Sequence, residues 1–596
     1  MTLKDEYTAI PLLPSTASDA APRKKGTCRA GLAVVKALLF GIGLWVCLNA
    51  AGLAPFPRCV TESLASKHHW KVEEQCPQAT AVVPTRNAEL WSSLGDTYGT
   101  DTFKSRAVEW LGGAVRVPTE SYDKMGPVGE DERWEAFGPF HDYLLNAFPL
   151  THSSLELTKV NTYGLVYVWK GSDESLKPLL LLAHQDVVPV NPDTVGEWTH
   201  PPYSGYFDGE RLWGRGSSDD KSGLIGILSS IESLLETGFQ PTRGVVLAFG
   251  FDEETSGLQG AASIGKYLEK TYGENSFLLI VDEGGGFANE YGGVIATPAV
   301  AEKGYLDVRV EVTSPGGHSS IPPDHTTIGI LSQLLVHYEE NPYEAQLSRG
   351  TPMYWKAQCL AAYAPDLPHK LRKELKKSVK SDKALKEAQK ELFKSKPFHA
   401  LVGTTQAIDL VNGGVKTNAL PELAWAVVNH RIATDSSVTA VQAHDTKLLK
   451  KLAQQFNLSY TAFGAQVSEQ GAPAYGTLTI SDAWGAALEP APISPIDAPE
   501  YALLSGTIKA TYNAHRSLTG DDNVAVAPGI MSGNTDTRWY WALTEHIYRY
   551  NHHNSGNATS LSNGVHTINE FLVADGFLEQ IRFFTTLILN ADEFEA

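Results

Sequence analysis

Cysteine is scarce in this sequence. There are five among 596 residues, and no two of them form a CxxC pair. The lack of such pairs excludes a cysteine-based zinc site, so histidine and carboxylate side chains would have to supply any metal ligands. Cys59 and Cys76 follow a long apolar run, and we expect them to form a disulfide in an oxidising compartment. Cys359 is then left over.

A basic face is missing as well. The net charge is −19, and lysine gathers only in the stretch from Pro365 to Pro397. Nucleic-acid binding is therefore disfavoured, because contacts with phosphates need clustered Lys and Arg. The leucines spaced along that stretch predict a solvated amphipathic helical insertion, with an interaction arm as the alternative.

One apolar run stands apart from this soluble character. Residues 37–56 carry no charge and approach the roughly 20 residues that cross a bilayer. Four basic residues shortly before the run place its N-terminal side in the cytoplasm by the positive-inside rule. We expect a cytoplasmic tail over 1–30, a single-pass signal anchor over 31–56 and the remaining chain across the membrane. A cleaved signal peptide and a buried core helix are the alternatives.

Short motifs agree with that topology. Tyr7–Ile10 and Leu12-Leu13 in the tail resemble signals that endosomal or vacuolar sorting adaptors bind. We therefore expect sorting adaptors as partners and a vacuolar or lysosome-like membrane as the destination. Asn457 and Asn557 each begin an N-glycosylation sequon and predict a glycoprotein.

The globular part begins after a polar stalk over 57–87. Apolar runs at 179–183, 245–251 and 277–281 alternate with helical patterns such as 223–238. Short apolar runs separated by helices indicate buried parallel strands, so we expect an α/β catalytic domain with a mostly parallel sheet over 88–302 and 488–596. The segments 535–550 and 570–589 are predicted to be helices that complete it.

A second pattern starts at Lys303. Residues 304–314 alternate apolar and polar side chains, as in a strand with one solvated face. Helical stretches at 326–340 and 441–456 and strand-like segments near 404–414 and 424–432 follow. This arrangement predicts an α+β lid domain, dimerisation-like in character, inserted over 303–487.

Metal-ligating residue types follow the predicted strands. His184 and Asp186, Glu253 and Glu254, and Asp282 each come directly after an apolar run. Because ligand crevices lie outside the carboxyl ends of strands in open α/β sheets, these donors should meet at one edge. Taken singly, each motif is equally compatible with a structural ion pair or a solvated loop.

Three further segments complete the set of donors. Asp219 lies in a Gly-rich turn whose spacing breaks both the GxGxxG and the P-loop patterns, so a metal bridge suits it better than a phosphate cradle. His318 and His566 lie in SPGGHSS and NGVHTINEF. Two adjacent glutamates cannot easily share one role. One should bind metal while the other acts as base toward the attacking water.

The ordered set resembles the di-zinc metallopeptidase family that contains carboxypeptidase S, aminoacylase, succinyl-diaminopimelate desuccinylase and glutamate carboxypeptidase. The resemblance covers roughly 90–596, and the N-terminal anchor and long insertion are closest to the membrane-anchored carboxypeptidase S branch. It implies two Zn²⁺ ions and a catalytic pair, Glu253 as general base with Asp186 orienting the first ligand. The implied metal ligands are His184, Asp219 as bridge, Glu254, Asp282 and His566.

The resemblance also implies residues that contact the substrate. His318 would polarise the scissile carbonyl, and Asn418 and Arg431 would hold the substrate carboxylate, for which an arginine fork is suited. Gly533 and Thr535 match the family's glycine-rich carboxylate-binding segment, although Asn534 departs from its commoner sequence.

The expected function is that of a zinc metallo-carboxypeptidase, a hydrolase that removes the C-terminal residue of short peptides. An N-acyl-amino-acid amidohydrolase of the aminoacylase type is the close alternative, because it would use the same site. A catalytically inactive receptor ectodomain on a peptidase fold is a third reading. It would predict losses at Glu253, Asp219 or His566, and all three are present.

Overall fold

The computed structural model describes residues 76–557 and 563–595. The predicted tail, apolar span and most of the stalk lie outside these residues. Within the two described ranges, no helix combines the length and the hydrophobicity that a membrane crossing requires.

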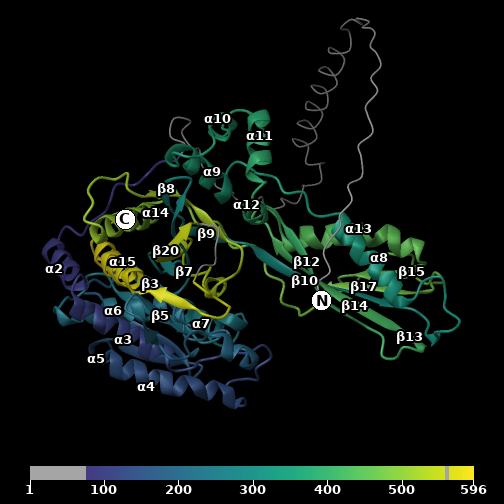
Figure 1. Ribbon diagram of the computed structural model, residues 1–596, viewed down its shortest axis with the longest axis horizontal. Helices are drawn as coiled ribbons and strands as arrows, with labels where there is room; N and C mark the ends of the chain where they lie inside the picture. The colour runs from purple at the N-terminus through teal and green to yellow at the C-terminus, as the bar shows by residue number, and fades with distance from the viewer. Residues whose placement is uncertain (1–75, 558–562, 596) are drawn as a thin grey trace, which may run out of the picture. The chain divides into compact units, whose positions relative to one another are not determined.

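The larger of two main sheets runs in the order β1-β2-β6-β3-β7-β20-β9-β19, with β8 and β18 attached beside β7 (Figure 1). The pairs β6–β3, β3–β7 and β7–β20 are parallel, so the centre of the sheet is parallel as predicted. The strands are β1 (Glu156–Val160), β2 (Gly164–Trp169), β3 (Leu179–His184), β6 (Val245–Gly250), β7 (Ile280–Glu290), β8 (Gly293–Ala296), β9 (Ala299–Glu302), β18 (Ala525–Val526), β19 (Gly529–Met531) and β20 (Ile547–Asn557).

Helices cover both faces of this sheet. Every residue of β3 and β6 is buried, which explains their unbroken apolar sequences. One face shares a hydrophobic core with α3 (Asp101–Val115), α6 (Lys221–Glu236), α14 (Pro499–His515) and α15 (Ala574–Glu593). The other face packs against α7 (Ala261–Tyr272). Smaller helices are α2 (Ala88–Tyr98), α4 (Phe137–Ala147) and α5 (Pro149–Ser154), and a small sheet joins β4 (Tyr206–Phe207), β5 (Arg211–Trp213) and β21 (Phe571–Val573).

A single residue connects the larger sheet to the second main sheet. β9 ends at Glu302, and β10 begins at Gly304, so Lys303 joins the two sheets. The order is β12-β14-β10-β17-β15-β16, and β10 alternates buried and half-buried residues as its sequence predicts. Its elements are β10 (Gly304–Thr313), β12 (Thr405–Gly413), β14 (Leu423–Ile432), β15 (Leu458–Ala462), β16 (Ala465–Gln466) and β17 (Gly476–Asp482), with α8 (Thr327–Glu340) and α13 (Val438–Gln455) packed on it.

A buried carboxylate stabilises this lid sheet against its helices. Asp445 on α13 accepts hydrogen bonds from Tyr338 and Tyr343, each over 3.0 Å, and contacts His430 Nε2 at 2.9 Å and His444 Nδ1 at 3.1 Å. Burial tends to raise the pKa of Asp445, but the hydrogen bonds to the two histidines outweigh it and hold the pKa at about 2.

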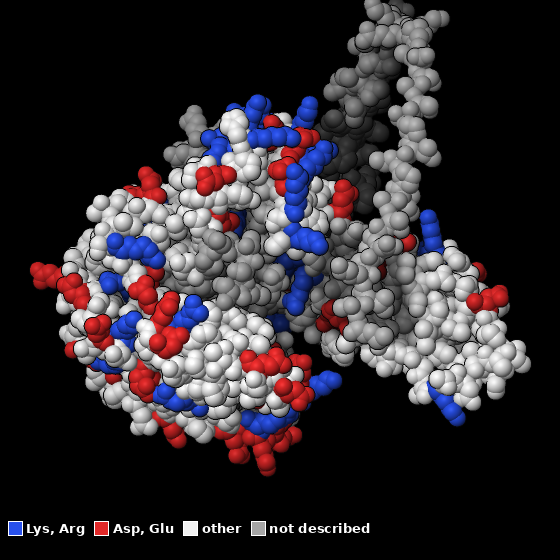
Figure 2. All heavy atoms as spheres, viewed as in Figure 1, with Lys and Arg blue, Asp and Glu red and all other residues white. Residues whose placement is uncertain are grey.

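The lysine-rich stretch forms part of a helical arm, α9 (Pro352–Tyr363), α10 (His369–Ser378), α11 (Asp382–Leu392) and α12 (Lys396–Val402). The predicted amphipathic helices are present: basic side chains gather on the outside of the arm (Figure 2), while leucines on α10 and α11 are buried. The inner face is not merely solvated, because it shares a hydrophobic core with Ile295, Ala525 and Ala527 next to the larger sheet.

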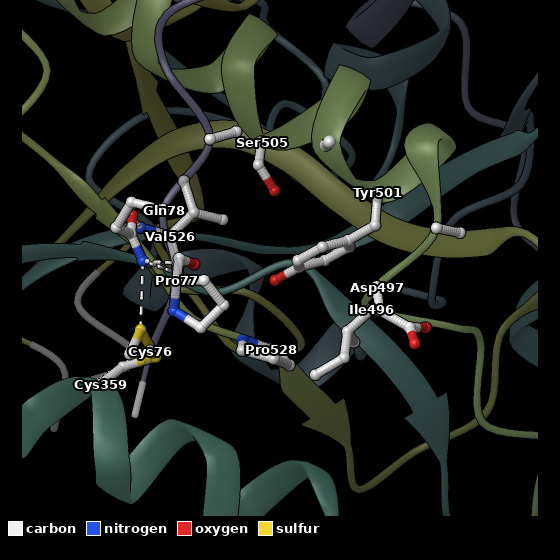
Figure 3. Close-up of a pocket in the computed structure, with 13 residues that line it drawn as sticks. Cys76, Pro77, Gln78, Cys359, Ile496, Asp497, Tyr501, Ser505, Val526 and Pro528 are labelled. Atoms are coloured by element: carbon white, nitrogen blue, oxygen red, sulfur yellow. Dashed lines mark hydrogen bonds between the residues drawn. A yellow bond between two sulfur atoms is a disulfide. The ribbon is translucent and has the colours of Figure 1, made fainter. Parts of the chain in front are cut away.

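A disulfide joins the arm to the start of the described chain. Cys76 pairs with Cys359 on α9, which corrects the predicted pairing of Cys76 with Cys59. Gln78 reinforces the junction, since its Nε2 donates to Cys76 Sγ over 3.1 Å and to the Val526 carbonyl over 2.9 Å (Figure 3). Proximity in sequence was misleading here because the arm folds back onto the N-terminal segment.

The predicted helix over 535–550 is wrong. The segment contains a short 3-10 turn, Asp536–Trp539, and then enters β20 at Ile547. Its aromatic and β-branched side chains suit a buried strand, and Tyr548 and Tyr550 are fully buried beside β7. The segment 570–589 instead contains β21 followed by most of α15.

Candidate metal centre

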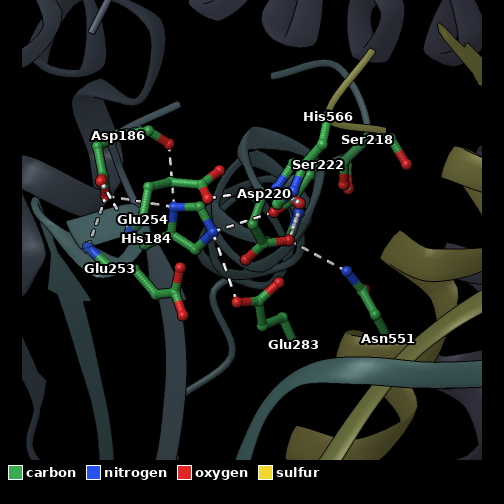
Figure 4. A network of polar contacts seen from close by, with 12 residues as sticks. His184, Asp186, Ser218, Asp220, Ser222, Glu253, Glu254, Glu283, Asn551 and His566 are labelled. Atoms are coloured by element: carbon green, nitrogen blue, oxygen red, sulfur yellow. Dashed lines mark hydrogen bonds and ion pairs between the residues drawn. The ribbon is translucent and has the colours of Figure 1, made fainter. Parts of the chain in front are cut away.

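Two groups of potential ligands meet at the carboxyl ends of the central strands. His184 ends β3, and its Nε2 lies 3.2 Å from Asp219 Oδ1 and 3.5 Å from Glu283 Oε1 (Figure 4). In the second group, His566 Nε2 lies 3.0 Å from Asp219 Oδ2 and 3.3 Å from Glu254 Oε2. The two oxygens of Asp219 therefore face different histidines, which is the geometry of a bridging carboxylate.

The Gly-rich turn before α6 presents Asp219. Gly216 has φ 83°, and a Cβ there would lie 2.5 Å from Cγ1 of Val187, so only glycine fits. The turn is fixed by the buried Glu570, which accepts hydrogen bonds from the backbone N–H of Ser218 over 2.9 Å and of Asp219 over 3.2 Å. Arg215 completes this support through a 2.6 Å ion pair with Glu570. Sequence reasoning missed Glu570, although it lies four residues after His566.

Asp186 holds several parts of the centre together. Its side chain is fully buried, and Oδ1 lies 3.3 Å from His184 Nδ1. The same carboxylate accepts hydrogen bonds from the backbone N–H groups of Glu253 and Glu254, both over 3.1 Å, and from the Ser121 hydroxyl over 2.6 Å. It thereby sets the orientation of one histidine and the position of the adjacent glutamates.

Glu253 differs from its neighbour in the way expected of a base. Both follow β6 on a short 3-10 turn, yet the Glu253 carboxylate belongs to neither ligand group. Burial raises the pKa of Glu253 well above the usual value for glutamate, and nearby carboxylates raise it further.

The donor set fits divalent cations. Oε1 of Glu254 is buried and has no hydrogen-bond partner, which leaves a carboxylate oxygen free for coordination. Hydrogen bonds to Asp219 and Glu254 raise the pKa of His566 to about 10, a measure of how strongly the cluster attracts positive charge. Buried carboxylates at this density need cations, and imidazole with carboxylate suits zinc, while carboxylate-rich sites also accept manganese.

Glu283, which was not predicted, joins His184 in a ligand group, while the role of the adjacent Asp282 as a metal ligand stays a prediction. Successive residues of a strand point to opposite sides, and the VDEG motif offers two adjacent acids. Glu283 approaches His184, whereas Asp282 lies outside both ligand groups and accepts a hydrogen bond from the backbone N–H of Glu283 over 2.9 Å. Which of the two acids faces His184 depends on the alignment of β7 with β3, and one sequence does not reveal this register.

Cations gather where the two sheets join. Arg431 on β14 and Arg538 both lie against the ring of Tyr305, at 5.6 Å and 5.4 Å from its centroid. Lys303 is close enough to Arg431 for the guanidinium to help burial lower the pKa of the lysine to about 8. Among the described residues, no carboxylate forms an ion pair with Arg431 or Arg538. We name Lys303, Arg431 and Arg538 the hinge cations. Arg538 was not predicted.

Other predicted substrate contacts are not gathered at the centre. His318 pairs with Ala419, the residue after Asn418, in a small sheet of β11 (Gly317–His318) and β13 (Ala419–Leu420). The side chains of His318 and Asn418 belong to neither ligand group. Thr535 is buried, and its N–H and hydroxyl both donate to Glu302, so these groups support the turn, while its role in binding substrate stays a prediction. Gly533 lies half-buried two residues earlier.

The central parallel sheet, with carboxylate–histidine groups that could hold metal at its edge and a glutamate outside them, is typical of a metallohydrolase of the α/β class. Residues 180–590 match the model of peptidase family M20/M25/M40, and the chain belongs to that family of metallopeptidases.

Individual proteins that are similar to this chain are carboxypeptidases or an N-fatty-acyl-amino acid synthase/hydrolase by name. Carboxypeptidase S of Saccharomyces cerevisiae is 37% identical over 549 residues, which cover 91% of this chain and 93% of that protein. The N-fatty-acyl-amino acid synthase/hydrolase PM20D1 of Mus musculus is 32% identical over 496 residues, covering 82% and 88%. An M20 family metallo-carboxypeptidase from Sulfolobus solfataricus, Sso-CP2, shares the fold with a TM-score of 0.53 at 16% identity, covering 82% of this chain and 99% of that one.

Proposed function

We propose that the protein is a metallo-carboxypeptidase that hydrolyses the last peptide bond of short peptides with two zinc ions. The observation that carries the proposal is the bridging position of Asp219 between two ligand groups, with Glu253 beside them and outside both. The 37% identity to carboxypeptidase S supports the peptide substrate.

The proposed ligands are His184, Asp219 and Glu283 for one ion, with Asp282 kept as the alternative to Glu283, and Asp219, Glu254 and His566 for the other. When bound, the ions would polarise the scissile carbonyl and make water a better nucleophile. Glu253 takes the proton from the attacking water and delivers it to the leaving amine, for which its raised pKa suits it. Asp186 keeps His184 in one tautomer and holds the Glu253 backbone in place.

The hinge cations explain why cleavage would be confined to the chain end. Arg431 and Arg538 present two permanently charged guanidiniums that have no acidic partner within 76–557 and 563–595, and a free α-carboxylate supplies one. Arg538 lies two residues from the buried Asp536. The charge of Asp536 raises the pKa of Glu253, so one short segment contributes both to the hinge cations and to the surroundings of the proposed base. His318 and Asn418 are retained as proposed contacts with the substrate.

A second candidate is hydrolysis of N-acyl amino acids at the same site. The 32% identity to a protein named N-fatty-acyl-amino acid synthase/hydrolase favours it. Both reactions cleave an amide whose amine side carries a free carboxylate, so they differ only in the acyl group.

The test is a substrate panel on the purified full-length chain. Free-acid dipeptides, C-terminally amidated dipeptides and N-acyl amino acids are compared with and without chelator. We expect release of C-terminal residues from free acids, resistance of the amides, and loss of activity with chelator that zinc restores. Equal cleavage of free-acid and amidated peptides would refute the carboxylate clamp.

The remaining proposals concern location. We propose that residues 31–56 anchor the protein in a vacuolar or lysosome-like membrane with the catalytic part on the lumenal side. Asn457 is exposed in the turn between α13 and β15, which is compatible with glycosylation. Glycosidase sensitivity and protease protection of intact vesicles test the topology, and digestion of an unglycosylated catalytic part from the cytosolic side would contradict it.

A further inference from the structure

A cavity of about 840 Å³ opens directly beside the metal centre. Asp219 and Glu283 form one end of it, and the volume falls within the roughly 300–1,000 Å³ of small-molecule sites. From there it extends along β7 and β20 toward the helical arm. Its apolar wall consists of Phe287, Met531, Val565, Phe571, Leu572 and Val573.

The charged side chains along this wall have partners of opposite charge. Lys356 from α9 lies 2.8 Å from Glu290, Arg516 is bound to Glu579 with one contact of 3.0 Å, and Asp575 lies 3.2 Å from His515. Burial lowers the pKa of His553, so this imidazole is neutral at pH 7. Away from the metal ligands, the cavity therefore combines its apolar wall with paired charges and with neutral polar side chains such as Asn551 and Asn563, which suits an uncharged, mainly apolar group.

The position of the cavity decides which part of a substrate it receives. None of the hinge cations lines it. If these cations hold the carboxylate of the leaving amino acid, as in the proposed function, the cavity is left for the opposite side of the scissile bond. Its first wall residues are metal ligands, so a group attached to the scissile carbonyl enters it directly.

We propose that this cavity binds the acyl side of the substrate as an extended, uncharged apolar group of several carbons. The inference rests on the proposed function and specifies its substrate class. The chemistry is shared by a long aliphatic penultimate residue of a peptide and by a fatty-acyl chain. The arm limits the length, because Lys356 on α9 and Pro397 next to the start of α12 complete the wall.

Chain-length dependence tests the proposal. Rates are measured on the full-length protein with N-acyl-leucines from acetyl to dodecanoyl and with Xaa-Leu dipeptides in which Xaa runs from alanine to norleucine. We expect kcat/KM to rise by about two- to fourfold per methylene until the cavity is filled. If kcat/KM rises only among the dipeptides, the apolar group that the cavity binds is a peptide side chain. If kcat/KM continues to rise through the dodecanoyl substrate, the group is a fatty-acyl chain.

A matched pair of variants locates the effect. Met531→Trp fills the cavity wall and should lower the ratio of long-chain to short-chain kcat/KM at least tenfold. Val336→Trp adds the same side chain on the exposed face of α8 and should leave that ratio at the wild-type value. An equal ratio in all three proteins would overturn the proposal.

The ion pair gives a second test that does not depend on a large side chain. Glu290→Gln leaves Lys356 uncompensated and should raise the use of acyl chains that end in a carboxylate at least fivefold relative to uncharged chains. Lys356→Met should do the reverse. Hydrolysis without any dependence on acyl length or on these charges would overturn this inference and leave the proposed function standing. No hydrolysis of any peptide or acyl amino acid would overturn both.

Discussion

The backbone N–H of Glu253 donates a hydrogen bond to Oδ1 of Asp186 over 3.1 Å. The same oxygen lies 3.3 Å from Nδ1 of His184. One buried carboxylate oxygen therefore lies against both the backbone of the proposed base and the first metal ligand, and the backbone carbonyl of Asp186 contacts His184 Nδ1 as well, over 3.0 Å. The consequence is that residues with no direct contact to substrate determine the geometry of the reaction.

Asp186→Asn should lower both zinc affinity and kcat by about 10- to 100-fold, because the new NH₂ group faces N–H donors. Zinc affinity is measured by competition with a fluorescent chelator, and kcat with a dipeptide. Ser121→Ala removes only the hydroxyl that donates to the same carboxylate and serves as the milder control. Wild-type zinc affinity in Asp186→Asn would contradict the positioning role.

Glu253→Gln should reduce kcat by about 10²–10⁴-fold while the bound zinc stays at the wild-type level, since the amide cannot accept the proton. Glu254→Gln should instead lose zinc. Elemental analysis of both proteins beside their turnover separates the two roles. A Glu253→Gln protein with near-normal turnover would show that another group acts as base.

Glu283→Gln should weaken zinc binding, whereas Asp282→Asn should affect it less, because only Glu283 approaches His184. The two substitutions are chemically matched and adjacent in sequence, so each controls for the other. Greater zinc loss in Asp282→Asn, measured by the same chelator competition, would show that Asp282 is the ligand, as the sequence pattern predicts.

Much of the larger fold and most of the candidate ligands could be predicted from the sequence because their signals are local. The runs 179–183 and 245–249 are apolar throughout because both faces of their strands are buried. Long-range choices were not predictable. The choice between Asp282 and Glu283 depends on strand register, and the partner of Cys76 depends on how the arm folds back. Glu570 was also missed, because its hydrogen bonds join residues more than 350 positions apart.

Glu570→Gln should lower zinc affinity and destabilise the protein by about 3–5 kcal/mol, since it leaves Arg215 buried without its partner. Chemical denaturation gives the free energy of unfolding, and chelator competition gives the affinity. Glu236→Gln, which breaks an exposed pair with Arg106, is the control and should change the stability by about 1 kcal/mol or less. Equal effects of the two substitutions would contradict a special role for Glu570.

Asp445→Asn should destabilise the protein by about 3 kcal/mol at neutral pH, because four partners lose the buried charge. The folded-state pKa of about 2 lies below the unfolded value of about 3.9. The contribution is therefore complete above about pH 5 and is lost as the pH falls through 2. Unfolding free energies of wild type and variant between pH 2 and 8 should differ by a constant amount above pH 5 and converge in acid. A difference that grows toward low pH would refute the assigned charge state.

The disulfide between Cys76 and Cys359 closes a covalent loop of the chain. Of the proposed ligands, His184, Asp219, Glu254 and Glu283 lie within this loop in the sequence, and His566 lies outside it. A single proteolytic cut anywhere inside this loop yields two fragments that remain covalently attached. The enzyme is thereby built to tolerate one internal cleavage without separating its ligands, which would matter in a compartment where proteases are abundant.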